Sequence, residues 1–236
     1  MNRNGLLRGF ALFFGMLCLC TSALLLLIRR ADRALQTSGS EMPPTLVIDA
    51  GHGGPDSGAI SLDGAKESEI NLAIALRLES IVRFCGQKTQ MTRWDDSSKS
   101  DILSYSERED LKQRAKLANE TAGAVLISIH QNDFPTDQPH GAQVLYSAYG
   151  GSEQLGKLIQ ANLVALLDPS NRRLAVPAPS ELYLTANTCC PAVLVECGFM
   201  SNSMEVLKLK ESRYQTALAV VIAGSFLSYI KGNTAI

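Results

Sequence analysis

Two short, almost unbroken apolar runs restrict the fold of this 236-residue chain more than any other feature. One lies within residues 45–49 and the other within residues 124–129. Continuous apolar runs of this length are typical of strands covered on both faces, as in a largely parallel sheet. Elsewhere, apolar residues recur every three or four positions, which is the spacing of helices that pack one face on a core. The pattern therefore predicts an α/β domain.

The complete pattern alternates strands and helices along a single domain. Strands are predicted at residues 45–49, 88–92, 124–129, 142–146, 181–185 and 192–196. Helices are predicted at residues 69–84, 106–122, 152–167, 203–210 and 213–230. The last helix is nearly apolar enough to resemble a membrane span, but its polar residues favour a helix packed on the core. We expect about six strands in a mostly parallel or mixed sheet, with helices on both faces.

The first thirty residues differ from the rest of the chain. Residues 9–28 are interrupted only by Cys, Thr, Ser and Gly, and a helix needs about 20 apolar residues to cross a bilayer. A cleaved signal peptide usually has an apolar region of only ~7–15 residues followed by a small-residue cleavage site, which this segment lacks. We therefore expect residues 1–30 to be a transmembrane signal anchor, residues 31–43 a linker and residues 44–236 the folded domain. A cleaved signal peptide is the alternative.

The charge of the chain narrows the choice of partners. The formal net charge is −1, and the domain has no basic run or basic patch interleaved with aromatic residues. Nucleic-acid binding would leave such a footprint, so we expect no nucleic-acid partner. Arginines flank the apolar N-terminal segment on both sides, so the positive-inside rule does not decide its orientation.

Two of the three histidines follow the apolar runs. His52 follows the first strand in a glycine-rich stretch, and His130 closes the third. Because parallel strands end at one edge of a sheet, both imidazoles should meet there. Glu67 precedes the first long helix, and two imidazoles with one carboxylate are a common catalytic zinc set. Glu196 closes the strand at residues 192–196 and could move the proton of a metal-bound water. These residues predict a metal-dependent hydrolase, in which the glycines let the chain turn around a ligand.

Each of these residues also has an ordinary structural explanation. A histidine at a strand end is most often a surface or capping residue. An acidic residue such as Glu67 or Glu69 is favoured at a helix N-terminus by the helix dipole, and spacing alone does not separate the two. Glu196 could simply end its strand, although a charge beside apolar residues requires a partner. Asp49 and Asn132 lie near the candidate ligands and could form hydrogen bonds that orient them.

Four segments together resemble the zinc-dependent N-acetylmuramoyl-L-alanine amidases of the Amidase_3 type. They occur in the family's order, within a resemblance that covers residues 44–231, at residues 47–54, 66–71, 127–132 and 193–202. The resemblance implies that His52, Glu67 and His130 bind Zn²⁺, which decides for Glu67 over Glu69. It also implies that Glu196 is the catalytic carboxylate. The implied reaction is hydrolysis of the amide between the lactyl group of N-acetylmuramic acid and the L-alanine of the peptidoglycan stem peptide.

One N-terminal anchor joined to one catalytic domain, without wall-binding repeats, resembles the sporulation branch of this family. Residues 105–114 and 141–143 also resemble that branch. The branch acts in the spore cortex, where removal of the stem peptide precedes formation of the muramic lactam needed for germination. The alternatives are a vegetative autolysin that separates daughter cells, a zinc carboxypeptidase or endopeptidase acting on the stem peptide, and a wall-binding module without activity.

The resemblance also sets expectations for location and partners. We expect a peptidoglycan substrate and contact with the cytoplasmic membrane through residues 1–30. The catalytic domain should lie outside that membrane, in the intermembrane space of the forespore for the sporulation branch, or be secreted if the anchor is cleaved. Whether an activating protein partner is needed is left open by the sequence.

Overall fold

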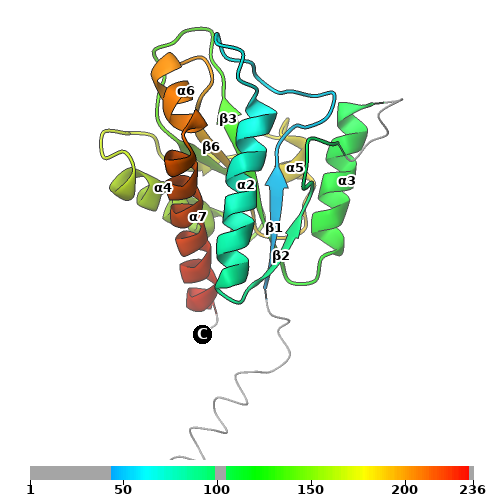
Figure 1. Cartoon of the computed structure of the whole chain (residues 1–236). Helices are drawn as coiled ribbons and strands as arrows, with labels where there is room; N and C mark the ends of the chain where they lie inside the picture. The colour runs from blue at the N-terminus through cyan, green and yellow to red at the C-terminus, as the bar shows by residue number, and fades with distance from the viewer. Residues whose placement is uncertain (1–43, 99–104, 234–236) are drawn as a thin grey trace, which may run out of the picture. The chain divides into compact units, whose positions relative to one another are not determined.

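A computed structural model describes residues 44–98 and 105–233 of the chain. In this part of the chain, six strands form one sheet in the order β2-β1-β3-β6-β4-β5 (Figure 1). The strands are β1 (Thr45–Ala50), β2 (Lys88–Met91), β3 (Ala124–Asn132), β4 (Gln143–Tyr146), β5 (Val176–Pro177) and β6 (Ala192–Phe199). Neighbouring strands run parallel, except that β4 runs antiparallel to β6. The expected six-stranded mixed sheet is therefore confirmed.

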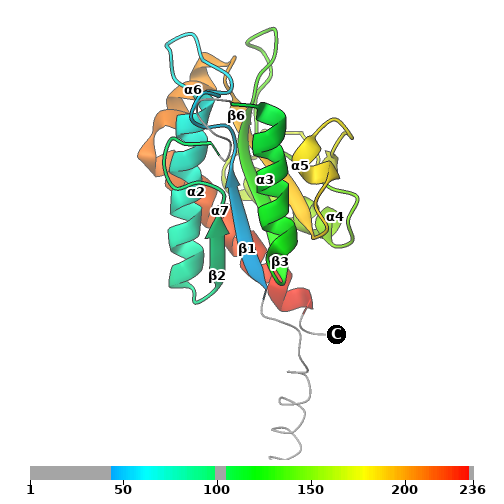
Figure 2. The same ribbon diagram turned by 90° about the vertical axis from the view of Figure 1, so that its right-hand side faces the viewer.

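Helices cover both faces of the sheet, as expected. One face carries α2 (Glu67–Phe84), α4 (Ser152–Leu166) and α7 (Ser212–Asn233), with α6 (Ser203–Lys210) beside α7. The other face carries α3 (Glu107–Glu120) and the single turn α5 (Tyr183–Ala186). Figure 2 shows α2 on one side of the strands and α3 on the other. Helix α7 buries Leu218, Ile222 and Phe226, so it packs on the core as predicted.

The two faces of the central strands differ near their carboxyl ends. On the α2 face, the side chains stay aliphatic to the end of β1 and as far as Ile129 of β3. On the α3 face, Val47 is followed two residues later by Asp49, and Leu126 is followed by Ser128 and then His130. Side chains of a strand alternate between faces, so these polar groups project to the same side. The sequence thus places a polar cluster on one face at one end of a hydrophobic sheet.

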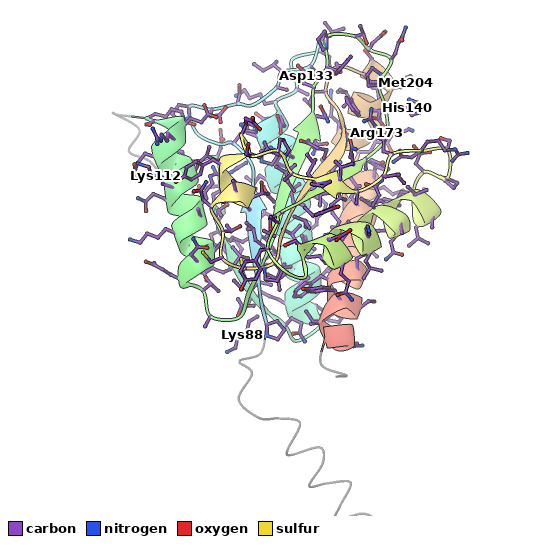
Figure 3. The ribbon with its side chains drawn as sticks, turned by 180° about the vertical axis from the view of Figure 1, so that it is seen from behind. Lys88, Lys112, Asp133, His140, Arg173 and Met204 are labelled. Atoms are coloured by element: carbon purple, nitrogen blue, oxygen red, sulfur yellow. The ribbon has the colours of Figure 1, made fainter. Side chains whose placement is uncertain are left out.

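The carboxyl ends of the central strands meet at the same end of the sheet. His130 and Glu196 are register partners in the parallel pairing of β3 and β6. Figure 3 shows Asp133, just beyond β3, at this end, and Lys88, the first residue of β2, at the opposite end. Open α/β sheets form their ligand sites outside the carboxyl ends of the strands. The fold therefore positions a site where the sequence predicts one.

The strand predicted at residues 181–185 is wrong. The edge strand is β5, and the predicted segment instead enters α5. Pro177 and Pro179 end the edge strand because proline has no N–H group to donate to a ladder. Beyond them the chain crosses the α3 face of the sheet, where Leu184 is buried in the same cluster as Ala115. The apolar residues of this segment therefore pack against α3 and do not form a strand of the sheet.

Three predicted boundaries also move, and each movement affects the site. Helix α2 begins at Glu67, so this residue lies in the first helical turn and not in the preceding loop. Strands β3 and β6 continue beyond His130 and Glu196, because their pairing resumes between Asn132 and Phe199 after an irregularity that follows His130. Both side chains therefore project from paired strands and not from strand ends.

The membrane anchor predicted at residues 1–30 and the linker at residues 31–43 lie outside the described residues. Among residues 44–98 and 105–233, no helix combines the length and the apolar character needed to cross a bilayer.

Candidate metal centre

The carboxylate of Glu67 lies between two histidines at the carboxyl end of the sheet. Its Oε2 is 3.3 Å from Nε2 of His52, and its Oε1 is 3.1 Å from Nδ1 of His130. The two imidazole rings meet edge to face, with their centroids 4.9 Å apart. One ligand atom from each residue lies within 4.8 Å of the other two. The structure thus brings together the three residues that the sequence predicts as metal ligands.

The loop after β1 aims His52 at this carboxylate. His52 has a φ of 60°, in the left-handed region that residues other than glycine seldom adopt. Its Nδ1 is 2.7 Å from Oδ2 of Asp56. Burial lowers the pKa of His52, but the hydrogen bonds to Asp56 and Glu67 outweigh burial and raise this pKa to about 10. The surrounding carboxylates therefore stabilise positive charge at this point.

Asp56 is a site residue that the sequence reasoning misses. A metal-binding histidine usually gives its second ring nitrogen to a carboxylate or carbonyl, which fixes the tautomer and the ring orientation. Asp56 holds Nδ1 of His52 in this way and leaves Nε2 facing Glu67. The available signal was an acidic residue four positions after a candidate ligand, within the same turn-prone segment.

Glu67 is both the first residue of α2 and a member of the site. A role at the helix N-terminus and a role in the site are therefore compatible for this residue. The backbone N–H of Ala59 donates to Oε2 and that of Gln131 to Oε1, each at 3.0 Å. The side-chain amide of Asn71 donates to Oε1 at 3.1 Å. Burial raises the pKa of Glu67, but the two histidines outweigh burial and hold this pKa well below its usual range. Glu69 is 61% exposed, so the structure places Glu67 and not Glu69 beside the histidines.

Two glycines make room for these side chains. A Cβ atom on Gly51 would overlap the imidazole of His130. A Cβ atom on Gly58, which has a φ of 63°, would lie 2.6 Å from Oε2 of Glu67. The close approach of the main chain to the site therefore requires glycine at both positions. This agrees with the expectation that glycines let the chain turn around a ligand.

Glu196 projects into the same pocket from β6. Its Oε2 is buried and has no hydrogen-bond partner among the described residues. Burial raises the pKa of Glu196 to about 7, against the opposing charge of His130. A carboxyl group with a pKa near neutrality can accept and return a proton. A buried oxygen without a partner is costly for a fold, so its position at the site points to a chemical role.

A pocket of about 290 Å³ opens over these groups. The β1–α2 loop, α3, β3, β6 and the α5 region all contribute to it. Residues that line it beyond the two histidines and Glu67 include Glu107, Arg114, Asn132, Tyr183, Leu184 and Glu196. A ligand in this pocket would therefore contact both the polar cluster and an apolar wall formed by α5.

Asp49, predicted to support the ligands, is buried beneath the site. Its Oδ1 accepts hydrogen bonds from Nη1 of Arg114 and Oγ1 of Thr92, both at 2.8 Å. Its Oδ2 accepts a hydrogen bond from the Ser128 hydroxyl. Arg114 in turn donates from Nη2 to the carbonyl oxygen of His52 at 2.7 Å. Asp49 is therefore linked to a candidate ligand through Arg114, a residue that the sequence reasoning did not select.

Asn132 and His140 have different positions. Asn132 lines the pocket close to His130, and its predicted hydrogen bond to a ligand stays a prediction. His140, the third histidine, is exposed in the loop before β4 and does not line the pocket.

The donor atoms fit a divalent transition metal such as zinc. Two imidazole nitrogens and one carboxylate oxygen converge at short distances, which is the set that catalytic zinc sites use while leaving a position for water or substrate. The carboxylates stabilise positive charge at His52. Glu196 lines the same pocket, and its Oε2 has no hydrogen-bond partner among the described residues.

The family profile of N-acetylmuramoyl-L-alanine amidase (Amidase_3) matches residues 46–227, which include every residue of this cluster. The chain belongs to this amidase family. The resemblance drawn from four short segments is therefore confirmed. As a member of the family, this amidase is a hydrolase that acts on the cell-wall peptidoglycan as an N-acetylmuramoyl-L-alanine amidase.

Relatives of this amidase support the same assignment. The germination-specific N-acetylmuramoyl-L-alanine amidase of Bacillus subtilis is 35% identical over 191 residues, which cover 78% of each chain. The solved CwlD amidase from Clostridioides difficile, in complex with the GerS lipoprotein, has a TM-score of 0.72 and 34% identity and covers 80% of this chain and 99% of that one. An N-acetylmuramoyl-L-alanine amidase from Clostridium difficile 630 has a TM-score of 0.70 and 31% identity, with coverage of 80% and 97%.

Replacement of Asp49 by Asn should destabilise the amidase at neutral pH and have less effect in acid. Burial raises the pKa of Asp49, but the charge of Arg114 and the hydrogen bonds outweigh burial and lower this pKa to about 2, from an ordinary value of 3.8. The ionised carboxylate therefore stabilises the fold above about pH 4, and this contribution is lost as the pH falls toward about 2. Loss of one partner of a buried ion pair costs about 3–5 kcal/mol, so the neutral-pH effect should approach that range.

Chemical denaturation of the metal-free wild type and Asp49→Asn checks this expectation. The difference in free energy of unfolding should be smaller at about pH 3 than at about pH 7. An equal difference at both pH values would show that the charge of Asp49 is not what stabilises the fold.

Proposed function

We propose that the protein is a zinc-dependent amidase in which His52, Glu67 and His130 hold the metal ion and Glu196 is the catalytic carboxylate. The observation that carries the proposal is the convergence of three donor atoms within 4.8 Å, beside a buried carboxyl group without a partner. The bond cleaved is the amide between the lactyl group of N-acetylmuramic acid and the L-alanine that begins the stem peptide.

Zinc, when bound, supplies a water of lowered pKa and polarises the carbonyl of the scissile amide. The residues of the chain do the remaining work. Glu196 takes a proton from the attacking water and delivers it to the leaving nitrogen. The C–N bond then breaks, leaving a carboxylate on the lactyl group and a free amino group on L-alanine. Asp56 keeps the His52 ring in one orientation, so that Nε2 faces the metal position.

The raised pKa of Glu196 suits this proton transfer. Burial places this pKa near 7, so the group exchanges a proton at neutral pH with little driving force needed in either direction. Glu67 differs because the two histidines keep it ionised. An ionised, hydrogen-bonded carboxylate suits metal binding, whereas a half-protonated one suits a shuttle.

The biological setting proposed is the spore cortex, with a role in maturation and germination. Similarity to the germination-specific relative extends over 78% of both chains. The LytC amidase of Bacillus subtilis, which is 30% identical, is matched over only 36% of its length. The similarity to a germination-specific amidase over most of its length therefore supports the cortex role over a vegetative one.

We also propose a location and a partner class. Peptidoglycan lies outside the cytoplasmic membrane, so the catalytic domain acts there, held by residues 1–30 as a signal anchor or secreted if the anchor is cleaved. The neighbouring CwlD structure contains the GerS lipoprotein. A membrane-associated protein partner is therefore the class to test for this chain as well.

Glu67→Gln should abolish tight zinc binding, and Glu69→Gln should not. The two residues lie in the same helical turn, but Glu67 is 4% exposed between the histidines and Glu69 is 61% exposed. Glu67→Gln should weaken zinc binding by more than the roughly 10–100-fold that loss of an outer hydrogen bond costs. Glu69→Gln should stay within about twofold, as expected for an exposed charge. Competition with a chromogenic zinc chelator measures both values. Equal affinities for the two variants would remove Glu67 from the metal site.

Glu196→Gln should stop hydrolysis without loss of zinc. The amide keeps the shape of the side chain but cannot carry the proton, so kcat on purified peptidoglycan should fall by roughly 10²–10⁴-fold. Zinc affinity should match that of the wild type, because Glu196 makes no hydrogen bond to the three donors. Hydrolysis by this variant near the wild-type rate would rule out the proposed role.

A further inference from the structure

Two buried arginines hold three consecutive carbonyl groups at the end of β1. Nε of Arg93 and Nη1 of Arg114 both donate to the carbonyl oxygen of Ala50, each at 2.8 Å. Nη2 of Arg93 donates to the carbonyl of Gly51 at 3.0 Å, and Nη2 of Arg114 donates to that of His52 at 2.7 Å. Arg93 is 3% exposed and Arg114 2%. The main chain that carries His52 is therefore held by hydrogen bonds from both arginines.

Arg93 also joins this segment to the start of α2. Its Nη2 donates to the carbonyl of Ser68 at 2.8 Å, and its Nη1 donates to the carbonyl of Asp95 at 2.9 Å. Ser68 directly follows Glu67 in the first turn of α2. The same guanidinium thus contacts the backbone beside two of the proposed metal ligands. Within the described part of the chain, the hydrogen bonds of the Arg93 side chain all end on main-chain carbonyls.

Arg114 joins the same segment to β1 and α3. Its Nη1 pairs with Oδ1 of Asp49 at 2.8 Å, and its Nε pairs with Oδ2 of Asp110 at 2.6 Å. The carboxylates of Asp49 and Asp110 therefore fix the guanidinium of Arg114, and its Nη2 donates to the carbonyl of His52. The position of His52 is set relative to a strand and a helix that are both parts of the core.

The buried charge of Arg93 is costly. Burial and the neighbouring charge of Arg114 both lower the pKa of Arg93. Positive charges near a cation site also oppose binding of the cation. His52 itself occupies a left-handed backbone conformation, which is strained for a residue other than glycine. A geometric benefit is needed to offset these costs, and the contacts to three successive carbonyls provide one.

We propose that Arg93 and Arg114 are positioning residues that preset the metal site, by holding His52 in its left-handed conformation and close to Glu67. The proposal rests on the zinc site proposed above. A planar guanidinium can serve several acceptors at fixed angles, whereas the single ammonium group of lysine cannot. Charge alone is therefore insufficient, and replacement by lysine should disturb the site while keeping the charge.

Arg93→Lys and Arg114→Lys test the proposal in the purified full-length chain kept in mild detergent. Zinc affinity, measured by chelator competition, should fall by roughly 10–100-fold in each variant, as for loss of other outer contacts at metal sites. Arg77→Lys is the matched control. Arg77 also donates to a main-chain carbonyl, that of Ala73. It lies further toward the C-terminus of α2 than Glu67 and does not line the pocket. The control should bind zinc like the wild type.

Thermal unfolding with and without zinc separates positioning from general stability. A positioning role predicts that zinc raises the Tm of Arg93→Lys and Arg114→Lys less than it raises that of the wild type. A purely structural role predicts a lower Tm without metal and an unchanged increase on adding zinc, with unchanged zinc affinity. That second result would overturn the proposal. A wild type that binds no zinc would instead overturn the proposed function on which the inference rests.

Hydrogen exchange of the wild type tests whether the site is ordered before zinc binds, even if both variants fail to fold. A preset site predicts slow exchange of the amides of Gly51 and Gly53 in the metal-free protein, where they donate to the carbonyls of Ile129 and Asp56. Zinc should change these rates little. Fast exchange without zinc that becomes slow with it would show that the metal orders the loop, contrary to the proposal.

Discussion

The buried carboxylate of Glu67 is the interaction on which this end of the molecule depends. An unpaired carboxylate would cost several kcal/mol to bury, and here two imidazoles and the backbone N–H groups of Ala59 and Gln131 compensate. These partners come from the β1–α2 loop and from β3, which are far apart in the chain. The site can therefore form only when helix α2 is docked against the central strands. Assembly of the ligand cluster therefore requires the folded sheet.

The same pocket pushes the pKa values of two carboxyl groups apart. The histidines keep Glu67 ionised, whereas burial raises the pKa of Glu196 to about 7. Pairs of this kind mark the division between an electrostatic role and a proton-transfer role. The division follows from the fold, because Glu67 enters between the histidines from a helix, whereas Glu196 stands beside His130 on the neighbouring strand. The parallel pairing of β3 and β6 thus separates a proposed ligand from a proposed shuttle.

Local patterns predict the parts of this structure that depend on local physics. The continuous apolar runs of β1 and β3 reveal buried strands, and the placement of His52 and His130 reveals a shared edge. The choice of Glu67 over Glu69 is not local, since both suit a helix start, and it came from family resemblance. Arg93 and Arg114 were not found because their partners are mainly distant main-chain atoms, which leave no periodic signal. The segment at residues 181–185 was misjudged for a related reason, since contact with α3 determines its shape.

The most direct test of the account is mass spectrometry of peptidoglycan digested by the full-length chain with added zinc and, separately, with a chelator. The account predicts free stem peptides that begin with L-alanine and glycan strands that have lost them, with both products absent in chelator. Fragments cut within the stem peptide, or the same products in the presence of chelator, would contradict the proposed zinc amidase.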